Sequence, residues 1–156
     1  QLAAQGAMVE AMVQAMEVKG WYYGDYYVPD RHSLYAAQVL TQQLYPVVMT
    51  ALRDLAGGGM IMLPSSVADF ANPELRDLIN ITQQSPVASS EDRVKFFKLA
   101  WDAVGSEFAS RHTQYEMFYA GATFVTKNHS YRTYDWDSSK SLVDRMLDSY
   151  SLKDEL

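Results

Sequence analysis

Apolar residues that recur at steps of three and four constrain the fold of this chain more than any other feature. In the segment after Ser89 they are Val94, Phe97, Trp101, Val104, Phe108, Tyr115 and Phe118. Residues 2–19 and 30–56 repeat apolar residues with a similar period. Because an α-helix turns once every 3.6 residues, side chains with this spacing lie on one face. The pattern predicts long helices that pack through their apolar faces, as in a bundle.

Glycine, proline and capping residues predict where the first helices begin and end. Gly20 ends the first helix, and Asp30 or Ser33 can cap the second. Pro46 lies inside the second helix, so we expect a kink there. The residues between these helices, 21–29, include five aromatic side chains. We expect them to form a connector that closes one end of a bundle.

Similar signals place the later helices. Asn72–Pro73 is typical of a cap and a first helical residue, and predicts a short helix through about Ile79. Ser89, with Asp92 three residues on, resembles a capping box and opens the longest helix, which Gly121 ends.

The last part of the chain is predicted to be irregular or briefly extended over residues 122–137, followed by a helix capped by Ser138 or Ser139. Its inward-facing residues are predicted to be Leu142, Val143, Met146 and Leu147. No alternating strand pattern competes. The predicted fold class is therefore all-α, with four substantial helices and one short one in a single domain over residues 1–156.

Composition excludes several classes of function. The 156 residues carry a net charge of −6 and no basic stripe, which argues against a nucleic-acid partner. The chain has no cysteine, so disulfides, thiolate metal sites and cysteine nucleophiles are excluded. Its three histidines lie far apart, and no metal site is predicted. No apolar run is long enough to cross a bilayer, so no membrane partner is expected.

The stretch from Ala56 to Phe70 contains three consecutive glycines, Gly57 to Gly59, followed by Leu-Pro-Ser-Ser a few residues on. Glycine allows positive φ and lets backbone lie close to another group. One interpretation is a helix stop with a tightly packed turn. The other is an approach of backbone to a ligand or another chain, where the hydroxyls of Ser65 and Ser66 suit an anion, or equally an ordinary helix cap.

A second candidate site is the glycine in the middle of the longest predicted helix. Gly105 costs about 1 kcal/mol relative to alanine there, and therefore needs a reason. The reason is either close helix packing or a break that turns Ser106 and Glu107 toward a ligand. Glu107, Arg111 and Glu116 fit a solvated, salt-bridged face. Because no nucleophile–base pair, acid dyad or phosphate loop is identifiable, no catalytic residue is predicted.

Several segments together carry a family resemblance. They are Leu40–Leu55, Ala56–Phe70, Asn72–Arg76, Phe97–Phe108, Arg111–Gly121 and Tyr131–Trp136. These segments, which extend over nearly the whole chain, resemble the C-terminal region of the 4-hydroxyphenylacetate 3-hydroxylase family. Its members are the oxygenase components of two-component flavin monooxygenases and include phenol and chlorophenol hydroxylases.

The resemblance implies a fold similar to that of acyl-CoA dehydrogenases, in which a helical N-terminal domain and a β-rich middle domain precede a C-terminal up-down four-helix bundle. This chain corresponds to the bundle. The resemblance also implies reduced FAD (FADH₂) as the cofactor, supplied by a separate reductase and bound between the middle domain and the bundle. It further implies O₂ and a phenolic substrate, a homo-oligomer (dimer or tetramer) and a cytoplasmic location.

The resemblance also assigns residues to the flavin site. The predicted cofactor-binding residues are Gly57, Gly58, Ser65, Ser66, Gly105, Ser106, Glu107 and Phe108. Gly105 and Ser106 are expected to contact FAD through backbone and hydroxyl groups, with Phe108 beside the flavin ring or the substrate. Gly57 and Gly58 resemble a glycine pair that, in dehydrogenase relatives, approaches the flavin of a neighbouring subunit.

The chain departs from the family in length. The N-terminal and middle domains, expected to hold the phenol, are absent from these 156 residues. We therefore expect a fragment of a larger oxygenase, inactive alone, that contributes half a flavin site and much of an oligomer interface. The dehydratase branch of the family needs cysteine ligands for an iron–sulfur cluster, and this chain has none.

Two alternatives stand beside this hypothesis. In one, the bundle is a non-catalytic oligomerisation or scaffold domain without flavin binding, and the glycine stretch serves packing only. In the other, the chain is a luminal secretory protein, because Lys153–Leu156 spells a retrieval signal and Asn80 and Asn128 begin glycosylation sequons. We interpret those short motifs as coincidence.

Overall fold

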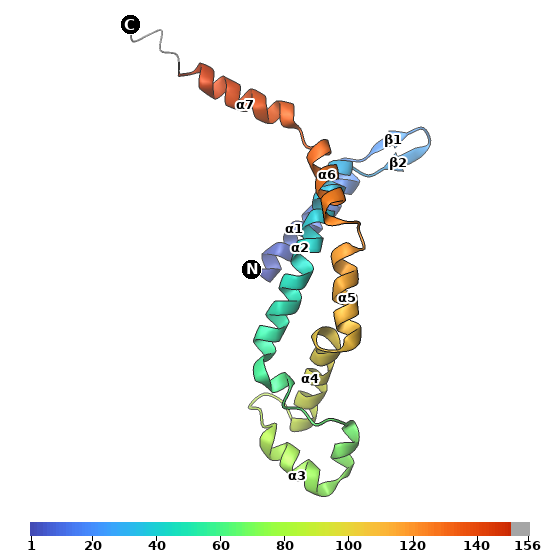
Figure 1. Cartoon of the computed structure of the whole chain (residues 1–156), viewed down its shortest axis with the longest axis vertical. Helices are drawn as coiled ribbons and strands as arrows, with labels where there is room; N and C mark the ends of the chain where they lie inside the picture. The colour runs from blue at the N-terminus through green and yellow to red at the C-terminus, as the bar shows by residue number, and fades with distance from the viewer. Residues whose placement is uncertain (151–156) are drawn as a thin grey trace. The chain divides into compact units, whose positions relative to one another are not determined.

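A computed structural model describes residues 1–150 and is largely helical (Figure 1). The elements are α1 (Leu2–Val18), β1 (Trp21–Tyr23), β2 (Tyr26–Val28), α2 (Arg31–Ala56), the 3₁₀ helices η1 (Gly57–Met60) and η2 (Val67–Ala71), α3 (Pro73–Thr82), α4 (Ser90–Val104), α5 (Glu107–Phe118), α6 (Thr123–Thr133) and α7 (Trp136–Asp148). The predicted helical class is confirmed. The up-down four-helix arrangement stays a prediction.

The chain forms two compact units, which are described separately. Among the described residues, one unit consists essentially of residues 41–120, and the other of residues 3–40 and 121–150. Helix α2 contributes residues to both units. The single domain expected over residues 1–156 also stays a prediction.

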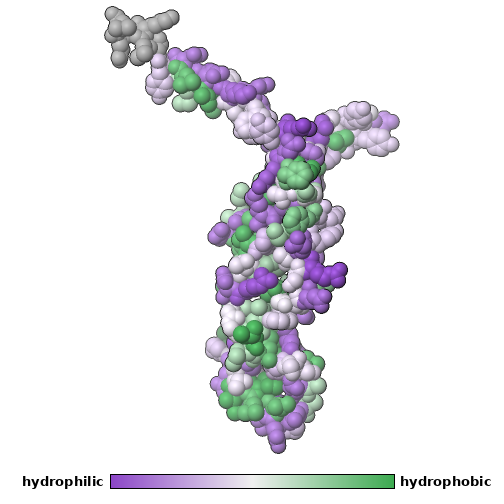
Figure 2. Space-filling view, viewed as in Figure 1, coloured by the Kyte–Doolittle hydropathy of each residue, from purple (hydrophilic) through white to green (hydrophobic). Residues whose placement is uncertain are grey.

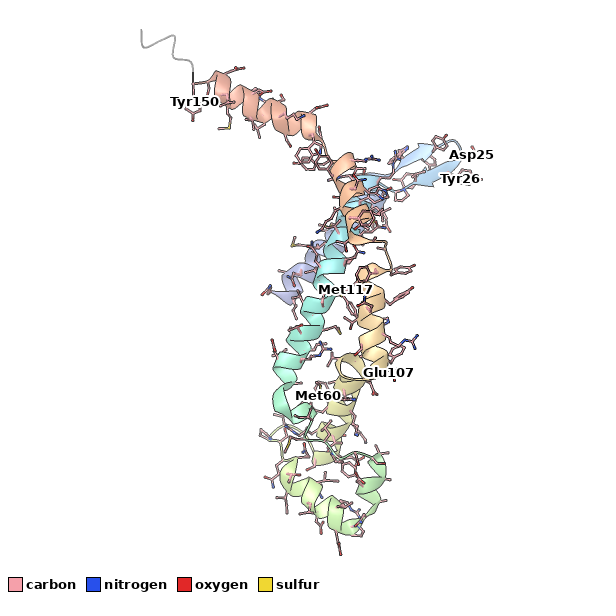
Figure 3. The ribbon with its side chains drawn as sticks, viewed as in Figure 1. Asp25, Tyr26, Met60, Glu107, Met117 and Tyr150 are labelled. Atoms are coloured by element: carbon pink, nitrogen blue, oxygen red, sulfur yellow. The ribbon has the colours of Figure 1, made fainter. Side chains whose placement is uncertain are left out.

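The unit of residues 41–120 has a small apolar core where α2, η1 and α4 meet. Its buried members are Met49, Met60 and Val104, and Tyr45, Val48, Ala56, Phe97 and Ala100 pack against them. Figure 3 labels Met60, which lies just after the glycine stretch. The core therefore fixes the end of α2 and the glycine stretch against α4.

In the other unit, the hairpin is anchored to α1 and an aromatic cluster forms beside α7. The Tyr27 hydroxyl donates to the carbonyl of Glu17 at 2.6 Å. Tyr131 and Tyr134 each lie within 5 Å of Trp136, centroid to centroid, and the Trp136 indole N–H donates to the carbonyl of Tyr131 at 2.8 Å. The structure thus brings these three rings together.

The predicted helix starts are largely confirmed. Asp30 Oδ2 accepts hydrogen bonds from the backbone N–H and the hydroxyl of Ser33 at the start of α2. Asn72 Oδ1 accepts from the N–H of Glu74, and Ser89 Oγ accepts from that of Asp92. Helix α2 runs continuously through Pro46, and the kink expected there stays a prediction.

Residues 21–29 were predicted only as a connector, and the structure shows strands in this segment. They form an antiparallel hairpin in which Tyr23 pairs with Tyr26 across Gly24 and Asp25. Gly24 has a φ of 59°, which a two-residue hairpin turn favours. Each strand is three residues long, so no alternation could be seen in the sequence.

The later helices also differ from the prediction. The longest predicted helix is divided into α4 and α5, residues 122–137 are mainly helical (α6), and α7 begins at Trp136 with Asp135 as its cap. Segment 123–133 has few apolar residues, so no stripe revealed α6. The apolar residues of α7 predicted to face inward are more than half exposed, at 53–63%.

Apolar side chains also reach the surface of the 41–120 unit, where Figure 2 shows them over α3. Among them are Leu78 and Ile81 of α3 and Val67 of η2. Within residues 1–150, no helix has both the length and the apolar character needed to cross a membrane. The retrieval-like motif at Lys153–Leu156 lies outside the described residues.

Candidate functional site

The break between α4 and α5 holds four of the predicted site residues. Helix α4 ends at Val104, and the backbone N–H groups of Gly105 and Ser106 both donate to the carbonyl of Trp101, at 2.7 and 2.9 Å. Helix α5 then begins at Glu107, which Figure 3 labels at this junction. The helix is therefore broken at Gly105, as one of the two interpretations expected. That the break turns Ser106 and Glu107 toward a ligand stays a prediction.

Gly105 is required by the ring of Trp101. Its φ of −117° is accessible to any residue, so backbone freedom is not the reason for a glycine. A Cβ built there would lie 2.7 Å from Trp101 Cε3 and 2.9 Å from Cδ2. The indole therefore occupies the space of a side chain at position 105, and close packing explains this glycine.

The Ser106 hydroxyl holds the two helices at the break. It accepts a hydrogen bond from the N–H of Ala109 at 3.0 Å, which caps α5, and donates to the carbonyl of Asp102 at 2.9 Å. Glu107 places a carboxylate in the first turn of α5, where the helix dipole favours negative charge. The Ser106 hydroxyl can therefore accept one more hydrogen bond, but its only proton is already donated to Asp102.

Phe108 begins an exposed row of rings on α5. It is 72% exposed and stacks on His112, with centroids 5.7 Å apart and planes within 10°. His112 Nε2 lies 3.4 Å from Glu116 Oε1. Glu116, predicted to share a salt-bridged face with Glu107 and Arg111, thus has the His112 ring as its neighbour.

Tyr45 of α2 approaches this row from the interior of the same unit. Its ring meets His112 edge-on at 5.8 Å. Partial burial and the nearby negative charge of Glu116 raise the pKa of the Tyr45 hydroxyl above its ordinary value. Tyr45 therefore stays protonated at neutral pH and can act as a hydrogen-bond donor.

The glycine stretch is open on one side and packed on the other. Gly57 has a φ of 54° and ends α2, and no atom lies within 4 Å of a Cβ built at Gly57 or Gly58. At Gly59 the nearest atoms belong to Phe97 and Arg93. The backbone of Gly57 and Gly58 is thus accessible, as expected of a segment that approaches a ligand or another chain.

Arg93 adds a positive charge beside these glycines. Its guanidinium lies over the ring of Phe97, 4.9 Å from the centroid. Its buried Nε has no hydrogen-bond partner among the described residues. Sequence reasoning missed Arg93, because the helical pattern alone does not indicate which α4 residue faces the glycine stretch.

The two predicted serines have different roles. Ser66 caps η2, where its Oγ accepts from the N–H of Ala68 and the Asp69 carboxylate accepts from the N–H of Ser66. The Ser65 carbonyl accepts from Lys98 Nζ at 3.1 Å. The interpretation of this stretch as an ordinary cap is therefore correct for Ser66.

Trp101 links Ser65 to the α4–α5 break. A cavity of about 210 Å³ is lined by Met60, Ile61, Leu63, Pro64, Ser65, Lys98 and Trp101. Because Trp101 also covers Gly105, one indole borders both predicted segments. Sequence reasoning placed Trp101 on the apolar seam and assigned Lys98 no role.

Among residues 1–150, no group of three or more acidic or histidine side chains is arranged to hold a metal ion.

Comparisons with solved structures define the class of fold. The chain aligns with the FAD complex of the 4-hydroxyphenylacetate 3-monooxygenase oxygenase component HpaB at a TM-score of 0.84 and 28% identity, covering 92% of this chain and 30% of that one. An archaeal 4-hydroxybutyryl-CoA dehydratase from N. maritimus gives a TM-score of 0.82 at 18% identity, which shows shared fold alone. The chain thus shares its largely helical fold with a part of both proteins.

The family follows from sequence. Residues 1–148 match the family described as 4-hydroxyphenylacetate 3-hydroxylase C terminal (HpaB), and the chain belongs to it. The 4-hydroxyphenylacetate 3-monooxygenase oxygenase component of Escherichia coli is 32% identical over 139 residues, 86% of this chain and 26% of that protein. The Pseudomonas aeruginosa component is 38% identical over 102 residues, 65% of this chain and 20% of that one. The chain thus spans less than a third of the length of these relatives.

Proposed function

We propose that this chain is the C-terminal helical part of a reduced-FAD-dependent phenol hydroxylase, in which it contributes to flavin binding and to oligomer contacts. The observation that carries the proposal is the family match over residues 1–148. A relative of the same fold is described as a complex with FAD and 4-hydroxyphenylacetate. The proposal includes O₂, a phenolic substrate, a separate reductase, a homo-oligomer and a cytoplasmic location.

The residues around the α4–α5 break and the glycine stretch fit such a cofactor. FAD has a flat aromatic ring system and an anionic diphosphate. The exposed Phe108 ring suits contact with an aromatic plane. The accessible Gly57–Gly58 backbone, with the positive charge of Arg93 beside Gly59, suits a polar, negatively charged group.

When bound, reduced FAD supplies the oxygen-transfer chemistry with O₂. The part of this chain is to bind and orient the cofactor and to exclude water. Phe108 would shield one edge of the site, while Ser106 and Gly105 set the path of the backbone at the break. The chain supplies no catalytic residue in this proposal.

A specific observation favours a second candidate function, a scaffold domain without flavin contacts. Gly105 and Ser106 are both explained within the chain, by the Trp101 ring and by capping. If these roles are complete, neither residue needs a cofactor. The two candidates differ in whether Phe108 and the glycine backbone contact flavin.

The test is an anaerobic titration of reduced FAD, with oxidised FAD as control, into the 156-residue chain and two variants. Phe108→Ala removes the exposed ring at the break. Phe96→Ala is the matched control, because Phe96 is 68% exposed on α4 and has no proposed role. We expect saturable binding that Phe108→Ala weakens by about two- to tenfold, the range of one aromatic contact, and that Phe96→Ala leaves unchanged.

Native mass spectrometry of the same samples reports the oligomer. A folded oligomer that binds no reduced FAD would mean that the site needs the rest of the longer protein, and the same variants are then compared in that protein. Equal affinities for Phe108→Ala, Phe96→Ala and the unchanged chain would refute the assignment of Phe108 to the flavin site.

A further inference from the structure

The two glycine segments of the candidate site share a structural context, since each follows the end of a helix. Gly57 and Gly58 come directly after the last residue of α2, and Gly105 comes directly after the last residue of α4. The position of each segment therefore depends on where its helix ends. A side chain that holds these two helix ends together would also fix the spacing of the two segments.

Arg53 makes this connection. It lies in the last turn of α2, four residues before Gly57. Its Nη2 donates a hydrogen bond to the backbone carbonyl of Val104, the last residue of α4. This one contact joins the final turns of both helices within the 41–120 unit.

The chemistry of helix ends explains why an arginine suits this position. The last carbonyls of a helix lack intrahelical partners and carry partial negative charge. A guanidinium keeps its positive charge at every physiological pH and offers several donors in a fixed plane. Arg53 can therefore donate a hydrogen bond to a carbonyl of α4. Its positive charge also interacts favourably with the negative, C-terminal end of the dipole of its own helix.

The local packing makes the contact specific. The Val104 side chain is 1% exposed and belongs to the core with Met49 and Met60. The bond from Arg53 therefore reaches a part of α4 that is already held against η1. Core packing fixes how closely the elements approach, and the Arg53 bond fixes which carbonyl of α4 lies opposite the last turn of α2.

We infer that Arg53 is a positioning residue of the flavin site, which sets the backbone of Gly57–Gly58 relative to that of Gly105–Ser106. This inference rests on the proposed function, because the spacing of the two segments matters for function only if both contact the flavin. Arg53 itself contacts no cofactor in this account. It acts through the two helix ends.

The test compares three variants of the 156-residue chain. Arg53→Met removes the charge and the donors but keeps a long side chain, and Arg53→Lys keeps the charge and a donor. Arg76→Met is the matched control, since it removes the same charge from an exposed position on α3 in the same unit. Thermal unfolding by circular dichroism, amide hydrogen exchange and anaerobic titration with reduced FAD are measured on each.

We expect Arg53→Met to weaken reduced-FAD binding by about tenfold, the low end for a hydrogen bond from a charged group because Arg53 is solvent-accessible. Amide exchange of Gly105 and Ser106, now protected by bonds to the Trp101 carbonyl, should rise together with that of Gly57 to Gly59. Helix content should match that of Arg76→Met, and the melting temperature should be lower than that of Arg76→Met because a hydrogen bond of the folded chain is lost. Arg53→Lys should restore most of the affinity.

The outcomes separate this inference from the proposed function. Unchanged exchange in Arg53→Met overturns the inference, and so does raised exchange with unchanged flavin affinity. If the unchanged chain binds no flavin, the flavin site needs the rest of the longer protein, and amide exchange in this chain decides whether Arg53 holds the two segments. Loss of affinity that Arg53→Lys does not restore also overturns it.

Discussion

Replacing Gly105 by alanine places a methyl group against the Trp101 ring. The new Cβ would lie 2.7 Å from Cε3, 2.9 Å from Cδ2 and 3.0 Å from Cζ3, so the indole must move. Overpacking of this kind costs about 1–3 kcal/mol. Alanine also lowers the conformational entropy of the unfolded chain. Because alanine can adopt the φ of position 105, this effect stabilises the folded chain by about 0.4–1 kcal/mol. Since Trp101 is 40% exposed and can shift, we expect a net loss of about 1–2 kcal/mol.

The assay is thermal unfolding followed by circular dichroism. For a chain of this size, the expected loss corresponds to a fall in melting temperature of roughly 2–8 °C. Two glycine variants serve as controls. In Gly58→Ala the new Cβ has no atom within 4 Å, so the stability of the chain should be equal or slightly higher. In Gly57→Ala the new Cβ also has open space, but the alanine must adopt a φ of 54°, which costs about 1–2 kcal/mol.

A second substitution tests the cause. Trp101→Leu removes the indole, so Gly105→Ala should no longer be destabilising in that background. The difference between the two backgrounds measures the coupling between residues 101 and 105. If Gly105→Ala is as costly without the indole as with it, the ring contact is not the reason for this glycine, and the explanation given for position 105 is refuted.

Three further predictions concern single contacts. Ser106→Ala should lower the stability of the chain by about 1 kcal/mol through loss of the α5 cap, whereas Ser106→Asp should retain the cap; thermal unfolding distinguishes them. Lys98→Met should increase proteolysis near Ser65 because it removes the Lys98–Ser65 bond, and Lys95→Met, which breaks only an exposed pair with Glu91, should not. Asp30→Ala should destabilise the chain at pH 7. Hydrogen bonds from the Ser33 side chain and backbone hold the folded pKa of Asp30 below its ordinary value of 3.8. The stabilising effect is therefore complete above pH 3.8 and is lost as the pH falls through the folded pKa, so the difference in unfolding free energy from the unchanged chain should narrow in acid.

The sequence predicted the helical elements where local chemistry was sufficient. The caps at Asp30, Asn72 and Ser89 are all present, because a capping side chain bonds backbone only two or three residues away. The break at Gly105 was likewise identified as an alternative. Helix α6 was missed, since it buries Thr126 and not an apolar stripe.

The candidate site was less accessible to sequence reasoning. Gly57 and Gly105 were both identified, but their roles differ for reasons that only the structure shows. Gly57 needs its positive φ, and Gly105 needs room for the Trp101 ring. The contacts of Arg53, Arg93 and Lys98 join residues more than thirty positions apart in the chain. No local pattern encodes such pairs.

The division of α2 between the two compact units has a consequence for making hybrid proteins from relatives of this chain. One boundary falls between Leu40 and Thr41, inside a continuous helix, and the other between Ala120 and Gly121. Cutting α2 at this boundary would leave residues 31–40 as a short helical end, and isolated helices below about 12–15 residues are marginal in water. Gly121, with a φ of 125°, lies outside α5 and α6. Segments exchanged between relatives should therefore be joined at Gly121, with α2 taken whole from one parent.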